Sequence, residues 1–310
     1  MTGSSLVSTV HRSLRVTAAA CLVVSLGCTE PPKPDDEGPA RFEKPPADVP
    51  FRVEDPNWKQ LFTATSTDGL HWETSKTPLA VSASSPQLVR VGRHLRVYFV
   101  DHGESLAWLP FEGGATTPVV IEGLGEGLQV DPCVSPTADG GLRLYFIHHP
   151  SEADPGLSPH NSIVSAVSDN GKSWTLEPGL RMEGGYVDPD VVELPEGGQR
   201  MYLTRSTHEV TSALSADGLS FELEDGLRFE GGGVTSTLLT TDGWMMFFHR
   251  EGTLGRVRSR KGLRFDGYQR LDIAAPEGGP WMLEAPSVLW HEDRLLMVYV
   301  LAPTSAEQVF

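Results

Sequence analysis

Two short sequence patterns alternate along most of this chain, and their spacing limits the folds that it can adopt. The first pattern is an apolar segment, a turn, and a second segment rich in aromatic and β-branched residues. Its five copies begin near Ser85, Asp131, Asp188, Thr235 and Ala285. Pro86 and Pro132 are 46 residues apart, Pro189 follows after another 57, and Pro286 lies 97 residues further on, across two repeats. A period near 50 indicates a repeat built from several short strands.

The second pattern is a strand, a tight turn with Asp or Gly, and an aromatic residue. Its copies span residues 64–72, 166–174, 213–221 and 258–265. Asp-Gly and Asn-Gly pairs favour hairpin turns because both residue types accept a positive φ at low cost. The two patterns together supply four strands per repeat. After Pro50 the sequence shows no amphipathic helical periodicity.

Four-stranded repeats of this length predict an all-β fold, a five-bladed β-propeller. The order of the patterns also predicts how the ring closes. The chain enters with the outer half of a repeat, Phe62 to Trp72, and ends with an inner half, Ala285 to Leu301. We therefore expect N-terminal outer strands to pair with C-terminal inner strands and complete the fifth blade, which removes open sheet edges. A sandwich or barrel is the alternative, but neither predicts complementary half-repeats.

The N-terminus reads as an export signal. Arg12 and Arg15 precede an apolar stretch that ends at Gly27-Cys28, which resembles a bacterial lipobox. Cleavage at another position is the alternative. We expect a lipoprotein signal peptide at 1–27, lipidation of Cys28, a disordered Pro-rich tether at 28–57, the propeller at 58–303 and a tail at 304–310.

Net charge limits the classes of partner, and cysteine content limits how the fold is stabilised. The formal net charge is −16, and loss of residues 1–27 removes Arg12 and Arg15 and no acid, which leaves −18. A strongly acidic chain argues against nucleic acid as a partner. Cys133 is then the cysteine left in the propeller, so the fold has no intramolecular disulfide and depends on its core.

Acidic residues recur where the innermost strands begin. In a propeller these strands line a central channel, so their first residues face one mouth of it. We assign these positions to Ser85, Asp131, Asp188, Thr235 or Ser236, and Glu284. Several carboxyl groups in one funnel are costly unless they are paired, hydrated or metal-bound. The alternative is a purely structural role, in which Asp caps the turn before a strand and Pro begins the strand.

These motifs resemble the five-bladed glycoside hydrolases of families 43 and 32 and their relatives, over residues 58–303. The resemblance implies Asp131, Asp188 and Glu284 as catalytic carboxylates. Glu284-Ala285-Pro286 resembles the Glu-Gly-Pro element that holds the general acid, so Glu284 would be the acid. Asp131 or Asp188 would be the base, and the other would orient the acid. The first inner strand departs from the family pattern, with Ser85 where Asp is usual, so the site is rearranged or hydrolysis is lost.

Further residues near the same mouth are candidates for substrate binding: Ser85, Asp190, Arg205, His249 and Arg250. We expect no cofactor and no catalytic metal, with a structural calcium ion in the channel as an alternative. Residues 168–174 also resemble the Asp-box turn of sialidases, which stabilises a blade and does not act on substrate.

Two functions stay open at this stage. One is a glycosidase-like lipoprotein that hydrolyses or binds glycosides, and the other is a non-catalytic propeller that binds a glycan or a protein. In both cases we expect a monomer at the bacterial cell envelope, held to the outer membrane by its lipid alone.

Overall fold

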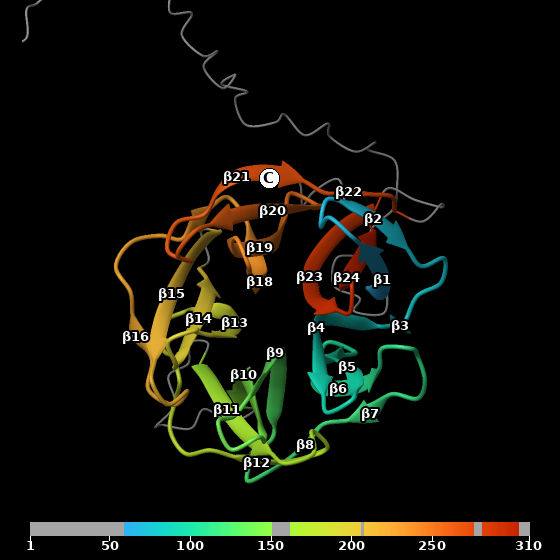
Figure 1. Cartoon of the computed structure of the whole chain (residues 1–310). Coiled ribbons are helices and arrows are strands. Elements are labelled where there is room, and N and C mark those ends of the chain that lie inside the picture. The colour runs from blue at the N-terminus through green and yellow to red at the C-terminus, as the bar shows by residue number, and fades with distance from the viewer. Residues whose placement is uncertain (1–58, 151–161, 206–207, 276–280, 304–310) are drawn as a thin grey trace, which may run out of the picture. The chain divides into compact units, whose positions relative to one another are not determined.

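The computed structural model describes residues 59–150, 162–205, 208–275 and 281–303. Within these residues the chain forms twenty-four strands in five small sheets and no helix. The sheets are arranged as the blades of a five-bladed β-propeller around a central axis (Figure 1). The predicted fold class is therefore confirmed, and the sandwich and barrel alternatives are wrong.

The blades follow one another along the chain, each running from the channel outward. The first blade consists of β4 (Ala83–Val91), β5 (His94–Asp101), β6 (Ser105–Pro110) and β7 (Thr117–Pro118). The second consists of β9 (Gly127–Pro136), β10 (Leu142–Pro150), β11 (Ser162–Ser168) and β12 (Ser173–Leu176), with β8 (Val120–Glu122) at its outer edge. The third consists of β13 (Val187–Glu193), β14 (Gln199–Thr204), β15 (Glu209–Ser215), β16 (Glu222–Leu223) and β17 (Phe229–Glu230). The fourth consists of β18 (Gly233–Thr240), β19 (Gly243–Arg250), β20 (Thr253–Ser259) and β21 (Asp266–Arg270).

The fifth blade joins the two ends of the ring. It consists of β23 (Trp281–His291), β24 (Arg294–Pro303), β1 (Gln60–Ser66), β2 (His71–Thr74), β22 (Asp272–Ile273) and β3 (Ala80–Val81). β1 pairs antiparallel with β24 over seven residues, from Gln60 opposite Leu301 to Ser66 opposite Leu295. Inner strands from the C-terminal side and outer strands from the N-terminal side thus form one sheet, as predicted from the half-repeats.

The second strand of each blade is apolar along nearly its whole length because both of its faces are covered by neighbouring blades. β24 is buried from Leu295 to Ala302, and β10 is buried from Leu144 to His148. Each carries a tyrosine with no exposed surface, Tyr299 and Tyr145 respectively. A strand covered on one face would alternate apolar and polar residues, so the continuous apolar runs report the stacking of blades.

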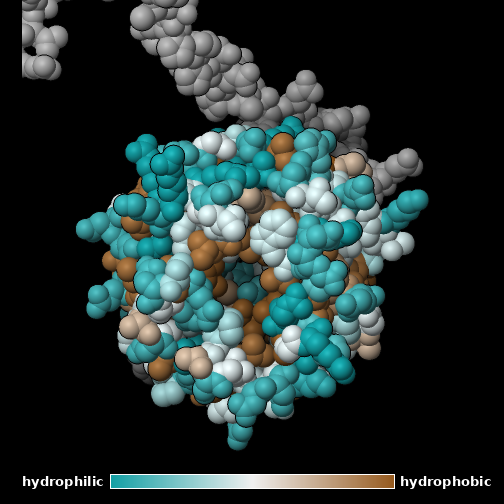
Figure 2. Space-filling model, viewed as in Figure 1, coloured by the Kyte–Doolittle hydropathy of each residue, from teal (hydrophilic) through white to brown (hydrophobic). Residues whose placement is uncertain are grey.

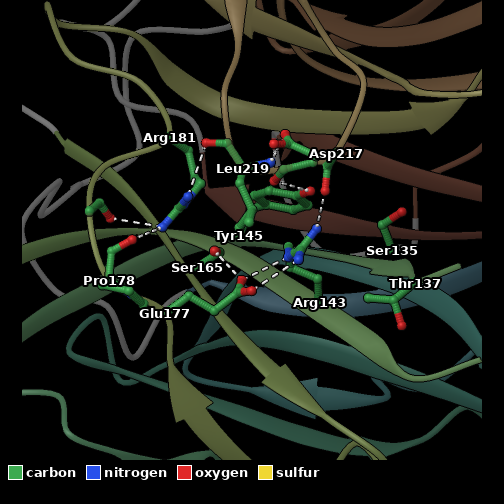
Figure 3. Close-up of polar contacts among 12 residues, drawn as sticks. Ser135, Thr137, Arg143, Tyr145, Ser165, Glu177, Pro178, Arg181, Asp217 and Leu219 are labelled. Atoms are coloured by element: carbon green, nitrogen blue, oxygen red, sulfur yellow. Dashed lines mark hydrogen bonds and ion pairs between the residues drawn. The ribbon is translucent and has the colours of Figure 1, made fainter. Parts of the chain in front are cut away.

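Neighbouring blades are joined by a repeated polar contact, shown for blades two and three in Figure 3. Arg143 of β10 pairs with Glu177 at 2.7 Å and donates to the carbonyl oxygen of Asp217 in the next blade at 3.0 Å. The hydroxyl of Tyr145 donates to the carbonyl oxygen of Gly218. Equivalent contacts run from Arg96 to Asn170 and from Arg200 to Lys261. Each turn is thus held by the preceding blade.

Several predictions concern residues outside the described part of the chain. These are the signal peptide at 1–27, lipidation of Cys28, the tether that ends at 57, and the tail at 304–310. Within the described residues, no helix has the length and apolar character needed to cross a membrane.

Candidate functional site at the channel mouth

Every inner strand carries a β-bulge at the same place. In each blade the first strand has one more residue than the second strand across the bulge, so the register between them slips by one residue. The first residue of each bulge has a positive φ, and these residues are Ser85 (45°), Asp131 (53°), Asp188 (55°), Val234 (49°) and Ala285 (44°). Bulges re-aim side chains and are common beside active sites.

The bulges correct the residue alignment of two repeats. In the fourth blade the position equivalent to Asp131 is Val234, and in the fifth it is Ala285. The sequence alignment placed Thr235 or Ser236 and Glu284 there, each displaced by one or two residues. In the fourth blade Thr235 stands where the other blades have the Pro that follows the bulge residue, so nothing in the sequence marks the bulge there. In the fifth blade Pro286 is present, and Glu284 was chosen one residue too early.

Next to the bulges, five hydrogen bonds between neighbouring inner strands form a ring around the channel. In each blade the side chain two positions after the bulge residue accepts from a backbone N–H of the next blade. The pairs are Gln87 with Val134, Cys133 with Val191, Asp190 with Thr237, Ser236 with Val288, and Ser287 with Leu88. Cys133 is buried, and burial raises the pKa of its thiol to about 12. This ring fixes the spacing of the inner strands.

A cavity of about 220 Å³ lies among these strands. Its lining includes Ser85, Asp131, Asp188 and Asp190, together with Thr235 and Thr237. Figure 2 shows the hollow at the centre of the ring. Ligand sites for drug-sized molecules usually exceed 300 Å³, so this cavity has room for a small ligand or for one end of a longer one.

Asp131 and Asp188 form a pair at this cavity. Their carboxyl groups share a hydrogen bond, and the backbone N–H of Asp188 also donates to Asp131. The Ser85 hydroxyl donates to Asp131 at 2.8 Å. Asp188 accepts from the Thr204 hydroxyl and from the backbone N–H of Val234. Each carboxyl therefore has its own donors in addition to its acidic partner.

Burial and mutual repulsion set the charge of the pair. Burial raises the pKa of Asp131, although the Ser85 hydroxyl and Asp188 oppose the rise. Burial, and then the charge of Asp131, raise the pKa of Asp188 well above its ordinary value. Two carboxyl groups in contact cannot both ionise at low cost, so the pair retains a proton to a higher pH than an ordinary aspartate does.

Asp190 is the third carboxyl at the cavity and belongs to the ring. It accepts from the Thr235 hydroxyl at 3.1 Å and from the backbone N–H of Thr237. Burial outweighs these donors and raises the pKa of Asp190 to about 7. Among the described residues, no group of three or more His, Cys, Asp or Glu side chains is placed to hold a metal ion, so the channel calcium stays a prediction.

The other predicted residues lie outside the lining of this cavity. Glu284 pairs with Lys59 at 3.2 Å and has 22% of its side chain exposed. His249 accepts from the backbone N–H of Ala285 at 3.4 Å, and burial lowers its pKa. Arg205 pairs with Glu209 at 3.5 Å, and Arg250 lies over the ring of Tyr268 at 5.6 Å. Cavity and prediction thus agree on Ser85, Asp131, Asp188 and Asp190.

Sequence reasoning missed two threonines of the site, Thr204 and Thr237. Thr204 follows an apolar run at the end of β14, where nothing in the sequence shows that the next blade reaches it. Thr237 alternates with Thr235 on one face of β18, a period-two signal that could have identified both.

A second hollow of about 830 Å³ lies between blades two and three, lined in part by Thr137, Arg143, Glu177 and Asp217. It is larger than the channel cavity, but Arg143 and Glu177 in its wall neutralise one another. Its polar groups are those that join the blades. The channel cavity is the better candidate for the functional site, because no cation among the described residues neutralises its carboxyl pair in the way that Arg143 neutralises Glu177.

Comparisons with known proteins agree with the fold. No family model matches the chain, and no curated protein matches its sequence. A protein of unknown function from Dyadobacter fermentans has a TM-score of 0.55 at 13% identity, covering 83% of this chain and 87% of its own. A putative glycosidase from Bacteroides thetaiotaomicron has a TM-score of 0.52 at 12% identity, covering 72% and 87%. The family-43 protein BlXynB from Bacillus licheniformis has a TM-score of 0.52 at 12% identity, covering 71% and 48%.

At these identities the likeness is one of fold. The ring described here is the five-bladed arrangement found in glycoside hydrolase structures, which include a thermostable family-43 enzyme with a TM-score of 0.52 at 8% identity, covering 69% of this chain and 88% of its own. Function must then be argued from the site.

Proposed function

We propose that this protein is carbohydrate-active and hydrolyses a glycosidic bond at the channel mouth, with Asp188 as the proton donor. The observation that carries the proposal is the Asp131–Asp188 pair, which lies beside a cavity and retains a proton to a higher pH than an ordinary aspartate does. Glycoside hydrolysis needs a carboxylic acid that stays protonated near neutral pH to protonate the leaving oxygen. Asp188 meets that requirement because of burial and the charge of its partner.

The second carboxylate of such a reaction must lie apart from the first. Retaining enzymes separate the two carboxyl groups by about 5–5.5 Å, and inverting enzymes by about 6.5–9.5 Å. Asp131 is hydrogen-bonded to Asp188 and therefore tunes and orients it, rather than acting across the bond from it. Of the three carboxyls predicted from the sequence, Glu284 is then left as our candidate for the base, in place of the acid role that the family resemblance implies for it; it pairs with Lys59 outside the lining of the cavity.

Binding without hydrolysis is the second candidate function. It is favoured by the same contact, since the two cavity carboxyls closest to one another are too close to flank a glycosidic bond. A carboxyl pair that retains a proton, with the hydroxyls of Ser85 and Thr204 nearby, offers acceptors and donors for sugar hydroxyls.

A panel of aryl glycosides and oligosaccharides separates the two functions. Hydrolysis by the wild type, with a loss of about 10²–10⁴-fold in kcat/KM for Asp188→Asn, supports the proposed reaction. Asp242→Asn changes an exposed carboxyl outside the cavity lining and serves as the control. Binding without cleavage supports the second function. If no carbohydrate is bound or cleaved, both are wrong.

The place of the protein in the cell is a separate proposal. The charged and apolar N-terminus that ends at Gly27-Cys28 supports export and lipid attachment at Cys28, with the propeller held at the cell envelope. The acidic charge supports the absence of nucleic acid partners, and a monomer stays our prediction. Intact-mass analysis should show the loss of residues 1–27 and an added acyl mass. A mature chain that begins elsewhere and carries no lipid contradicts the anchor.

A further inference from the structure

Thr204 lies where the third blade meets the fourth. It ends β14 and is buried, with 6% of its surface exposed. Its hydroxyl donates to the Asp188 carboxyl and accepts from the backbone N–H of Val234 at 3.1 Å. That N–H also donates to Asp188. One hydroxyl oxygen therefore connects the Asp188 carboxyl to the bulge of the neighbouring blade.

The fourth blade is shaped to approach Thr204 closely. A Cβ atom added at Gly233 would lie 2.8 Å from Cγ2 of Thr204, so a larger residue would push the two apart. Val234 follows with a φ of 49°, which is costly for a β-branched residue. Such strain persists only where the surroundings hold the backbone in place. At Val234 the positive φ points the backbone N–H toward Thr204 and Asp188.

The other member of the pair also has a hydroxyl donor at the cavity. Ser85 occupies the bulge of the first blade, and its hydroxyl donates to Asp131 at 2.8 Å. Each carboxyl thus has one hydroxyl donor: Asp131 accepts from Ser85 of the preceding blade, and Asp188 accepts from Thr204 of its own blade. Ser85 was anticipated from the sequence as a residue of this site, whereas Thr204 was not.

We infer that Thr204 is a positioning residue for Asp188, fixing its carboxyl relative to Asp131 through contact with the fourth blade. This rests on the proposed use of Asp188 as the proton donor. The hydroxyl favours the charged form of Asp188, because it donates to the carboxyl. Its removal should leave the pair protonated to a higher pH and free the carboxyl to rotate.

The first test needs no catalytic activity. Protein labelled with ¹³C at the aspartate carboxyl carbons is titrated by NMR, and the Asp188 signal is identified by its loss in Asp188→Asn. We expect Thr204→Val to move the Asp188 titration to higher pH and Thr204→Ser to restore it. Thr240→Val is the control, since Thr240 lies at the turn between β18 and β19, outside the cavity lining. An unchanged Asp188 titration in Thr204→Val overturns the inference.

The second test measures kcat/KM against pH on any glycoside that the wild type cleaves. In Thr204→Val, the limb of the profile that falls with rising pH should shift to higher pH. The kcat/KM at the optimum should fall roughly ten- to a hundredfold, as expected for a displaced catalytic group. If Thr204→Val does not fold, Thr204→Ala gives the same comparison without added bulk. A wild type that cleaves nothing but shows the predicted NMR shift defeats the proposed function and leaves the positioning role standing.

Discussion

Tyr145 in the second blade donates a hydrogen bond of 2.9 Å to the backbone carbonyl oxygen of Gly218 in the third. The same relationship joins Tyr98 to Gly171 at 2.7 Å and Tyr202 to Gly262 at 2.9 Å. In each case an aromatic residue of the next blade packs edge-on against the tyrosine, as Phe221 does against Tyr145 at 5.8 Å. The turn glycine is therefore an inter-blade contact as well as a bend.

The first prediction concerns Gly218→Ala. Gly218 has a φ of 72°, and a Cβ atom there would lie 2.4 Å from Nη1 of Arg143 and 2.8 Å from the Tyr145 hydroxyl. We expect a loss of about 2–4 kcal/mol in unfolding free energy, from backbone strain and from displacement of both side chains. Chemical denaturation measures it.

Gly92→Ala is the matched control for this prediction. Gly92 has a φ of 60°, and nothing lies within 4 Å of an added Cβ atom. The control should cost only the backbone strain, about 1 kcal/mol. Equal losses in the two variants would show that the inter-blade contact adds nothing.

Closure of the ring is tested by Phe62→Ala. Phe62 lies in β1, is 3% exposed and packs against Tyr299 with ring centroids 6.3 Å apart. Because β1 completes the fifth blade, truncation should cost about 3–5 kcal/mol, as for other large core residues. Val120→Ala, at a side chain that is 69% exposed, should change stability by less than about 0.5 kcal/mol. A small effect at Phe62 would mean that the ring does not depend on this strand.

The fold was readable from the sequence because its signals are local. Asn170-Gly171 and Asp217-Gly218 mark turns by their backbone preferences, and apolar runs such as that of β24 mark strands covered on both faces. The complementary half-repeats then determined how the ring closes. Because each of these signals lies within one repeat, the repeat period was enough to identify the blades.

The site was readable only in part because bulges change which residue faces the channel. Asp131 and Asp188 were found through the Pro that follows each of them, but Glu284 was aligned with them although Ala285 holds the equivalent position. Thr204 could not be found, since its role depends on contact with Val234 of another blade. The ring of hydrogen-bonding side chains that includes Gln87 could have been predicted, because its members recur at one position of the repeat, two residues after the bulge residue.

Stability should depend on pH through Asp190. The folded protein keeps the proton of Asp190 up to about pH 7, whereas the ordinary pKa is 3.8. The folded state therefore binds more protons than the unfolded state between these values, and stability falls as pH rises from about 4 to about 7. The contribution of this one group is on the order of 1–4 kcal/mol.

Asp190→Asn removes this ionisable group and keeps its shape. Denaturation at pH 5 and pH 8 should show a smaller loss of stability with rising pH in the variant than in the wild type. Asp242→Asn, at an exposed position, should leave the pH dependence unchanged. A variant whose pH dependence matches the wild type would assign the effect to other groups.

The central claim is that Asp131 and Asp188 act as one unit, and a double-mutant cycle tests it most directly. Hydrolysis of a cleaved glycoside, or the Kd of a bound one, is measured for Asp131→Asn, Asp188→Asn and the double variant. Groups that work as a unit show strongly non-additive effects. We predict that each single variant loses most of the function and that the double variant is little worse than either. Effects that add in free energy, or single variants that match the wild type, would contradict the account.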